Sequence, residues 1–191
     1  MNTSNISFII VLIGAFFLGA STPLSADFVS MVTMCESCHG KDGISVDPEV
    51  PIIAGFSYEG FLNTIDVFRH NERIALSYQR PGEPETVMND IALSLNDEDA
   101  EALAEYFSNR PFISAPQEAD EEQAMRGAIL HKQKCERCHR ENGKAPVMSA
   151  AILAGQWTPY LRRQFTNILE GKRIIPRSML RRLRDMPEED I

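Results

Sequence analysis

The sequence lacks the features that define several protein classes. Its 19 Lys and Arg stand against 27 Asp and Glu, a formal net charge of −8. A surface that neutralises nucleic-acid phosphates needs clustered basic residues, so nucleic acid is excluded as the main partner. Disorder of the whole chain is excluded because 43% of the 191 residues are hydrophobic. No stretch of useful length alternates apolar and polar residues as strands do, and the predicted fold class is therefore mostly α, with long loops.

The N-terminal segment has no charged side chain before Asp27. It contains an apolar run of 15 residues, 6–20, which is shorter than the roughly 20 residues of a bilayer-spanning helix. Small residues follow the run, so residues 1–26 are predicted to be a signal peptide that is cleaved near Ala26 and directs export to the periplasm. Retention as a membrane anchor is the alternative, because no Lys or Arg precedes the run.

All four cysteines lie in two copies of one motif, CESCH at 35–39 and CERCH at 135–139. The shift of 100 residues also aligns Gly43 with Gly143, residues 52–55 with 152–155, and Arg73 with Arg173. Further along the chain the shift is 91, and it pairs Met88 with Met179. This internal duplication predicts two tandem domains, at 27–110 and 120–191, joined by a linker at 111–119 that two prolines border or interrupt.

Helical patterns occur at matching places in the two copies. Helices are predicted over 27–34, 60–70 and 97–110 in the first copy, and over 120–134 and 160–170 in the second. In the helix over 97–110, Asn96 can cap the start, and one face carries Ala100, Leu103, Ala104 and Phe107. The last residue, Ile191, pairs with Ala100, so the second domain is expected to lack its copy of this closing helix and to expose apolar surface.

Two cysteines three residues apart and followed at once by histidine are typical of c-type haem attachment. On one tight helical turn the two thiols can reach the two vinyl groups of one porphyrin edge, while the imidazole points at the iron. The motif predicts two covalently bound haem c groups, with anchors at Cys35, Cys38, Cys135 and Cys138 and fifth iron ligands at His39 and His139.

Zinc binding, dithiol chemistry and disulfide formation are the alternatives to haem attachment for these cysteines. A zinc site normally gathers its ligands within about twenty residues, whereas these motifs lie 100 apart. A dithiol redox pair normally has a βαβ context, which is missing here. Two disulfides are the usual arrangement for four cysteines in an exported protein, but the paired spacing favours haem.

Methionine is the usual sixth iron ligand in electron carriers. Met88 and Met179 are predicted to be the axial ligands, because they are the one methionine pair in equivalent positions of the repeat. His70 and His131 have no counterparts, and both are expected to face solvent. Two six-coordinate irons leave no open position for a substrate. We therefore expect an electron-transfer protein without catalytic residues, whereas a dihaem peroxidase would need an exchangeable sixth ligand.

With these residues the chain resembles a tandem class I cytochrome c. The second copy, CERCHRENGKAP at 135–146 with ILAGQWTPYL at 152–161, is similar to the cytochrome subunit of flavocytochrome c sulfide dehydrogenases. This resemblance implies a periplasmic electron-accepting subunit bound to a flavoprotein that carries FAD and oxidises sulfide. Electrons would then pass to a soluble or membrane-bound acceptor. A free-standing dihaem shuttle that serves a terminal oxidase is the alternative.

The charges are divided unevenly between the two copies. Residues 27–118 carry 17 acidic and 5 basic side chains, whereas residues 119–191 carry 10 acidic and 14 basic ones. The two halves are expected either to steer different redox partners by charge or to be ordinary solvated surfaces.

Overall fold

The computed structural model describes residues 26–80, 82–146, 148–187 and 190, so the predicted signal peptide lies outside the described residues apart from Ala26. The helical elements are α1 (Ala26–His39), η1 (Lys41–Gly43), α2 (Tyr58–Arg69), α3 (Met88–Ser94), α4 (Asp97–Ser108), α5 (Glu121–Leu130), η2 (His131–Cys135), α6 (Arg140–Gly143), α7 (Thr158–Leu169) and α8 (Arg177–Arg184). Among the described residues the only β pairing is two isolated bridges, which confirms the mostly α fold class.

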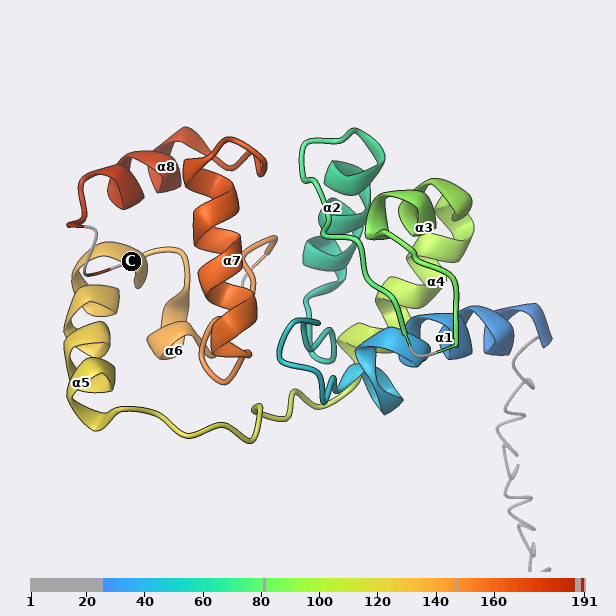
Figure 1. Ribbon diagram of the computed structural model, residues 1–191, viewed down its shortest axis with the longest axis horizontal. Helices are drawn as coiled ribbons and strands as arrows, with labels where there is room; N and C mark the ends of the chain where they lie inside the picture. The colour runs from blue at the N-terminus through green and yellow to red at the C-terminus, as the bar shows by residue number, and fades with distance from the viewer. Residues whose placement is uncertain (1–25, 81, 147, 188–189, 191) are drawn as a thin grey trace, which may run out of the picture.

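The helices form two groups that lie side by side in Figure 1. We refer to α1–α4 as the N-terminal domain and to α5–α8 as the C-terminal domain. An extended segment after α4 runs along one side of the molecule to α5 (Figure 1). None of the described helices is long and apolar enough to cross a membrane.

The N-terminal domain is built around the packing of α2 against α3 and α4. Phe61 of α2 stacks on Phe107 of α4 with ring centroids 5.8 Å apart, and Leu103 is fully buried beside them. Each buried side chain of this size contributes roughly 1.5–3 kcal/mol of transfer free energy. The closing helix thereby completes the apolar core of the first copy.

Helix α4 confirms the sequence prediction closely. The Asn96 side chain accepts a hydrogen bond from the Asp99 backbone N–H at 2.8 Å, which is the expected N-cap. Its predicted apolar face is buried, and the helix ends at Ser108 rather than at Arg110.

The first helix of each copy differs from the prediction. Helix α1 runs through the whole motif to His39 instead of ending near Met34, because no Gly or Pro interrupts it before Gly40. Gly40 ends the helix with a positive φ of 76°. In the second copy α5 ends at Leu130, and a π-helical turn with a bond from Glu136 N–H to the His131 carbonyl at 2.9 Å leads to Cys135.

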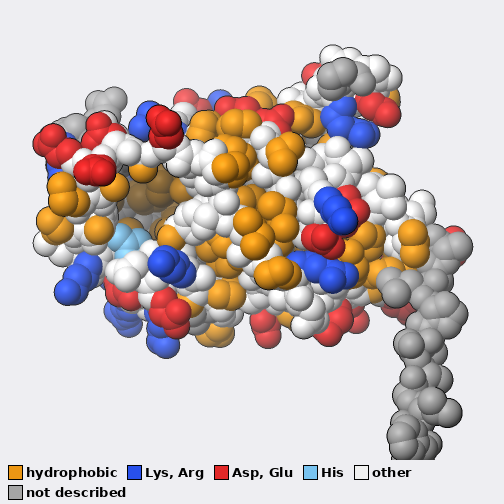
Figure 2. All heavy atoms as spheres, turned by 90° about the horizontal axis from the view of Figure 1, so that it is seen from below, with side chains coloured by type: hydrophobic (Ala, Val, Ile, Leu, Met, Phe, Trp, Pro, Cys, Tyr) orange, Lys and Arg blue, Asp and Glu red, His pale blue; other side chains and the backbone are white. Residues whose placement is uncertain are grey.

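Helix α5 of the C-terminal domain exposes apolar side chains. No side chain of α5 is buried, and Met125 and Ile129 are 64% and 59% exposed. A groove lies between α5, α7 and α8, with Leu130 and Leu183 among its lining residues. In Figure 2, which views the molecule from below, the left part is hollowed, with apolar walls and a histidine at the rim.

The two domains meet through buried polar contacts and a shared apolar cluster. The Gln156 side chain accepts from the Ile52 N–H and donates to the Ile52 carbonyl, both at 2.9 Å. Trp157 Nε1 donates to the Ser45 carbonyl at 3.1 Å, and Trp157 and Tyr160 pack with Ile52. Because both domains supply atoms to these contacts, separating the domains would break these hydrogen bonds and expose the shared apolar cluster to water.

Candidate functional site

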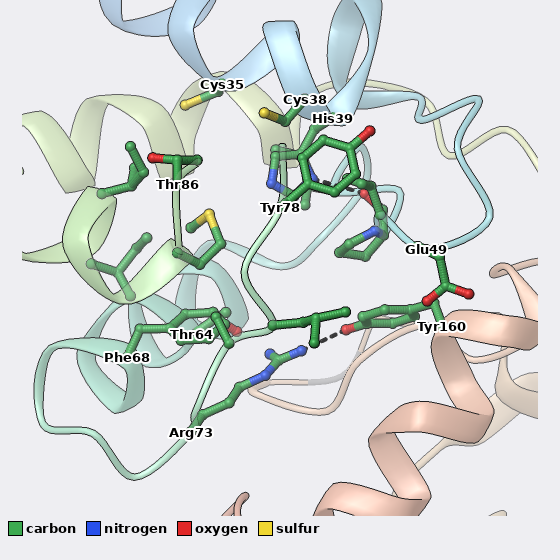
Figure 3. Close-up of a pocket in the computed structure, with 18 of the residues that line it drawn as sticks. Cys35, Cys38, His39, Glu49, Thr64, Phe68, Arg73, Tyr78, Thr86 and Tyr160 are labelled. Atoms are coloured by element: carbon green, nitrogen blue, oxygen red, sulfur yellow. Dashed lines mark hydrogen bonds between the residues drawn. The ribbon is translucent and has the colours of Figure 1, made fainter. Parts of the chain in front are cut away.

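The first motif lies on the last turn of α1, and its side chains face a pocket. Cys35, Cys38 and His39 line one side of the pocket, above the centre in Figure 3. A helical turn brings positions i and i+3 to the same face, so the C-x-x-C spacing presents both thiols together. The sequence prediction that these three residues act together is therefore consistent with where the fold places them.

The histidine of each motif is oriented by the backbone. His39 Nδ1 lies 2.9 Å from the Pro51 carbonyl, and His139 Nδ1 lies 2.9 Å from the Ala151 carbonyl. A carbonyl oxygen only accepts, so Nδ1 carries the proton in both rings and Nε2 presents its lone pair. A hydrogen bond from Nδ1 to a backbone carbonyl is a usual way in which a protein sets the tautomer of a metal-ligating imidazole.

Electrostatics favour the neutral imidazole in both sites. Burial is the main reason that the pKa of His39 lies below its ordinary value, and the charge of Arg73 adds to the effect. Burial likewise lowers the pKa of His139, with contributions from His131 and Arg173. A neutral imidazole is the form that binds iron.

The first cysteine of each motif lies in an environment that favours the protonated thiol. Burial, assisted by the charges of Cys38 and Glu36, raises the pKa of Cys35 to about 12. Burial also raises the pKa of Cys135, against the opposing charge of Arg182 on α8. Redox-active cysteines need a lowered pKa, so these environments argue against dithiol chemistry.

Other metal and disulfide chemistry finds no support in the described part of the chain. All four cysteines are free there, and no group of three or more His, Cys, Asp or Glu could together hold a metal ion. A structural zinc site needs four such ligands.

Met88 lies at the start of α3 and lines the same pocket as His39 and the two thiols. Much of the remaining wall is apolar, with Phe61, Ile65 and Phe68 of α2 among its members. The pocket therefore combines two thiols, one imidazole and one thioether with a largely apolar lining. Because no helix is predicted over 88–94, the position of Met88 on a helix was not foreseen.

The second motif lies in a less enclosed setting. Cys138 is exposed, whereas Cys135 and His139 are partly buried. Met179 lies in the first turn of α8 and is partly buried. Helix α8 approaches the motif, since Arg182 acts electrostatically on Cys135.

A glycine that follows each motif accepts two backbone hydrogen bonds, and we refer to this arrangement at Gly43 and at Gly143 as the glycine cradle. The Gly43 carbonyl accepts from the N–H groups of Ile53 and Ala54 at 2.9 and 3.1 Å, and the Gly143 carbonyl accepts from Leu153 and Ala154 at 2.8 and 3.1 Å. Both glycines have positive φ, 78° and 81°, which disfavours any side chain. The backbone conformation at these two positions therefore explains why both copies of the repeat have glycine there.

The two unpaired histidines behave differently. His70 is exposed, as predicted. The prediction for His131 is wrong: its side chain is only 16% exposed, and Nδ1 lies 3.1 Å from Glu136 Oε2. A Cβ on Gly143 would lie 3.3 Å from His131 Nε2, whereas a Cβ on Gly43 would lie 2.9 Å from the Phe107 ring. His131 therefore occupies, next to the cradle, the place that α4 fills in the N-terminal domain.

Sequence reasoning also missed residues that the C-terminal domain contributes to the first pocket. Tyr160, Arg163 and Gln164 of α7 line it together with Arg73. Figure 3 shows Tyr160 and Arg73 pointing toward each other. The three residues of α7 lie where the first copy has Gly60, Asn63 and Thr64. The repeat therefore gave no signal for them, because their role belongs to one copy only.

Comparison with known proteins finds similar cytochromes but no matching family model. No protein-family model matches the chain. Cytochrome c4 from Azotobacter vinelandii is 29% identical over 156 residues, which is 73% of this chain and 70% of the relative. The thiosulfate dehydrogenase electron acceptor from Stutzerimonas stutzeri strain A1501 is 28% identical over 92 residues, which is 48% of this chain and 39% of the relative.

Structural comparison agrees with the sequence matches. The crystal structure of reduced recombinant cytochrome c4 from Pseudomonas stutzeri superposes with a TM-score of 0.68 and 27% identity, covering 86% of this chain and 91% of that one. The chain thus has the two-domain class I cytochrome c fold and is cytochrome c4-like. The cytochrome c4 proteins to which it is similar are electron-transfer proteins and not enzymes.

Proposed function

We propose that the chain is a dihaem c-type cytochrome that carries electrons in the periplasm. Thioether bonds to Cys35 and Cys38 hold the first haem c, and bonds to Cys135 and Cys138 hold the second. The iron ligands are His39 with Met88 and His139 with Met179. The observation that carries the proposal is the duplicated histidine geometry, in which each Nδ1 donates to a carbonyl twelve residues further along at 2.9 Å.

The residues present fit a covalently bound haem. A haem c group supplies an iron that changes its charge by one unit, at a potential that the protein tunes. The pocket offers two thiols for thioether formation, an imidazole with a free Nε2, and an apolar wall. Phe61, Ile65 and Phe68 exclude water from this wall, which favours the less charged, reduced state.

The chain's own residues restrict the chemistry to outer-sphere transfer. One imidazole and one methionine sulfur would hold the iron at each site, and no ligand position would then be left for a substrate. The backbone bonds to Pro51 and Ala151 hold the two rings fixed, which limits rearrangement when the charge changes.

We propose that the donor is a dehydrogenase that oxidises a reduced sulfur compound. The partial similarity to a thiosulfate dehydrogenase electron acceptor supports a sulfur substrate. The resemblance of residues 152–161 to flavocytochrome subunits favours sulfide as the substrate and an FAD-containing flavoprotein as the partner. A free-standing shuttle is the second candidate, because the similarity to cytochrome c4 covers more of the chain.

Mass and visible spectroscopy on the protein purified from its native host test this proposal. We expect two covalent haems and a methionine-to-iron charge-transfer band, and the loss of one haem in the C35S/C38S and C135S/C138S variants. Met88→Ala and Met179→Ala should each remove part of the band. Absence of covalent haem, or a high-spin iron in the unaltered protein, contradicts the proposal.

Mild purification, followed by reduction and oxidation assays, distinguishes three candidates: the flavocytochrome subunit, the acceptor for thiosulfate dehydrogenase and the free-standing shuttle. Co-elution of a flavoprotein with bound FAD supports the flavocytochrome assignment. A flavin-free protein that is reduced by thiosulfate dehydrogenase supports the thiosulfate pathway. A flavin-free protein that neither dehydrogenase reduces, but that a terminal oxidase oxidises, supports the free-standing shuttle.

A further inference from the structure

His131 is a largely buried titratable side chain that the proposed function does not use. Its side chain is 16% exposed, and neither ring nitrogen has a hydrogen-bond partner among the described residues. Nδ1 lies 3.1 Å from Glu136 Oε2, which is close enough for an ion pair but is not aligned as a hydrogen bond. Burying an imidazole in this way costs free energy, because its hydrogen bonds to water are not replaced. The arrangement therefore calls for an explanation other than stability.

A π turn places this imidazole beside the carboxylate, and the first copy has no such turn. The Glu136 N–H bonds to the His131 carbonyl at 2.9 Å. Residues three and four apart are neighbours on an α-helix, whereas a π turn bonds residues five apart, which is the spacing of this pair. In the first copy α1 is an α-helix through the same positions, and Met31, the counterpart of His131, packs against the apolar core. Only the second copy therefore pairs a histidine with the glutamate of the motif.

Glu136 connects His131 to the second haem site. The Oε2 atom that faces the imidazole also accepts the Asn142 N–H at 3.1 Å. Asn142 adjoins Gly143 of the glycine cradle, and His131 Nε2 lies on the other side of that glycine. His131 also acts electrostatically on His139, the histidine of the motif. A change of charge on His131 is therefore transmitted to the second site.

Several other groups contribute to the electrostatic field in this part of the domain. Those that carry or can carry a charge on the π turn, on the motif and on the segment through α8 are Lys132, Lys134, Glu136, His139, Arg173 and Arg182. Glu136 attracts a proton to the imidazole, whereas the lysines and arginines repel it. A histidine ordinarily changes its charge between about pH 5 and 8. His131 can therefore exchange a proton with solvent under physiological conditions.

We propose that His131 and Glu136 form a proton-binding site that couples reduction of the second haem to the uptake of one proton from solvent. The inference rests on the proposed function, because the second haem supplies the change of charge. One electron from the redox donor lowers the charge of the iron by one unit. One proton from the aqueous solvent binds to the imidazole at the ring nitrogen that lacks one. The charge gained by His131 equals the charge lost at the iron.

The direction of the coupling follows from the signs of the charges. The oxidised haem carries one more positive charge than the reduced haem and repels an imidazolium more strongly. Reduction therefore favours the protonated form of His131, and by reciprocity protonation favours reduction. The reduction potential of the second haem should fall as the pH rises through the range in which the imidazole loses its proton. The first haem has Met31 at this position and lacks this contribution.

Spectroelectrochemical titration of the holoprotein between about pH 5 and 8 tests the proposal. At a fixed applied potential, we expect the reduced-to-oxidised ratio of one haem to fall about tenfold over this range, which is 59 mV for a one-electron couple. His131→Met copies the first domain and should abolish this fall. His70→Gln removes an exposed histidine of the N-terminal domain and is the matched control, which should retain it. An undiminished fall in folded His131→Met overturns the proposal.

Two glutamate variants separate the charge of Glu136 from a merely structural role. Glu136→Gln keeps an oxygen that can accept the Asn142 N–H, but the imidazolium loses its counter-charge. The fall in the reduced-to-oxidised ratio should then move to lower pH. Glu36→Gln makes the same change in the first copy, where the glutamate accepts the Asp42 N–H and faces no histidine, and should leave the pH profile unchanged. Equal pH profiles of the two variants contradict the proposal.

Histidine NMR measures the proton directly and needs no substitution at His131. The chain has four histidines, and if two of them bind iron, His70 and His131 are the two that can titrate. The His70→Gln variant assigns the two signals. We expect His131 to take up its proton at higher pH in the reduced protein than in the oxidised protein, while His70 titrates equally in both.

Equal titration of His131 in the two redox states overturns the proposal. Counting the covalent haems by mass in the same sample distinguishes this outcome from a failure of the proposed function, which would show as missing haem.

Discussion

The two domains share the geometry of their motifs but not the construction of their cores. In both, the histidine Nδ1 lies 2.9 Å from a carbonyl, and a glycine of positive φ receives two backbone bonds. The N-terminal domain buries a continuous cluster around Phe61 and Phe107. In the C-terminal domain, Trp157 and Tyr160 instead pack against Ile52 of the other domain. The site geometry is therefore local, whereas the cores depend on helix packing.

This difference predicts that the C-terminal domain depends more on its neighbour. Its first helix has no buried side chain, whereas α1 of the N-terminal domain packs on α4. Apolar burial is the main source of folding free energy. Four variants, ordered here from the largest expected effect to the smallest, test the comparison.

Phe107→Ala removes the centre of the N-terminal core. The side chain is fully buried, so we expect a loss of about 3–5 kcal/mol of unfolding free energy, measured by chemical denaturation of the holoprotein. Ile129→Ala on α5 is the control, and it should change stability by less than about 0.5 kcal/mol because the side chain is 59% exposed. Equal effects of the two variants would show that the asymmetry of the cores has no energetic meaning.

Trp157→Phe tests how strongly the domains are joined. It removes the donor to the Ser45 carbonyl and leaves that acceptor buried, so we expect a loss of about 1–3 kcal/mol. The unfolding transitions of the two domains should also move apart. Gln79→Ala removes an exposed hydrogen bond away from the interface and should have little effect. A single, unchanged transition for Trp157→Phe contradicts the prediction.

Gly43→Ala and Gly143→Ala compare the two cradles directly. Both positions have positive φ, which costs roughly 1–2 kcal/mol for an L-residue. At Gly43 the added Cβ would also lie 2.9 Å from Ile53 and Phe107, whereas at Gly143 its nearest contacts are at 3.3 Å. Gly43→Ala should therefore be the more destabilising of the two in a thermal melt, and the reverse order would be inconsistent with the closer packing of the first cradle.

Two tyrosines should titrate in opposite directions from their common value near 10. A hydrogen bond to Asp47, together with burial, raises the pKa of Tyr78 to about 12. Burial opposes ionisation of Tyr160, but the charges of Arg73 and Arg173 outweigh it and lower the pKa. Carbon-13 NMR of labelled tyrosine, with Tyr78→Phe and Tyr160→Phe for assignment, measures both.

The same shifts give the pH dependence of stability. The contribution of Tyr78 is fully present below pH 10 and is lost as the pH rises through about 12, because the native state holds this proton more tightly. The contribution of Tyr160 has the opposite sign: it is present above pH 10 and is lost as the pH falls through the lowered native value. Titration of Tyr78 before Tyr160 would contradict both assignments.

Much of the site was predictable because its parts are close in sequence. The motif spacing brings Cys35, Cys38 and His39 onto one turn, and the repeat led to Gly43 and Met88. The repeat also showed that Arg73 and Arg173 are equivalent, but it did not show that they form a bridge between the two domains. The inward turn of His131 was not predictable, because it depends on which neighbour fills the space beside Gly143.

The sequence by itself determined the helical class, the duplication and the two C-x-x-C-H motifs, because helical periodicity and local spacing fix which side chains share a turn. Only the tertiary structure decided what the interface contains. Tyr160 and Gln164 reach the first pocket, and Arg73 and Arg173 share one acceptor, because the domains pack against each other at this point. The bonds from Arg73 to Tyr160 and Gln164 join residues 87 and 91 positions apart, and no local pattern encodes which of them will meet.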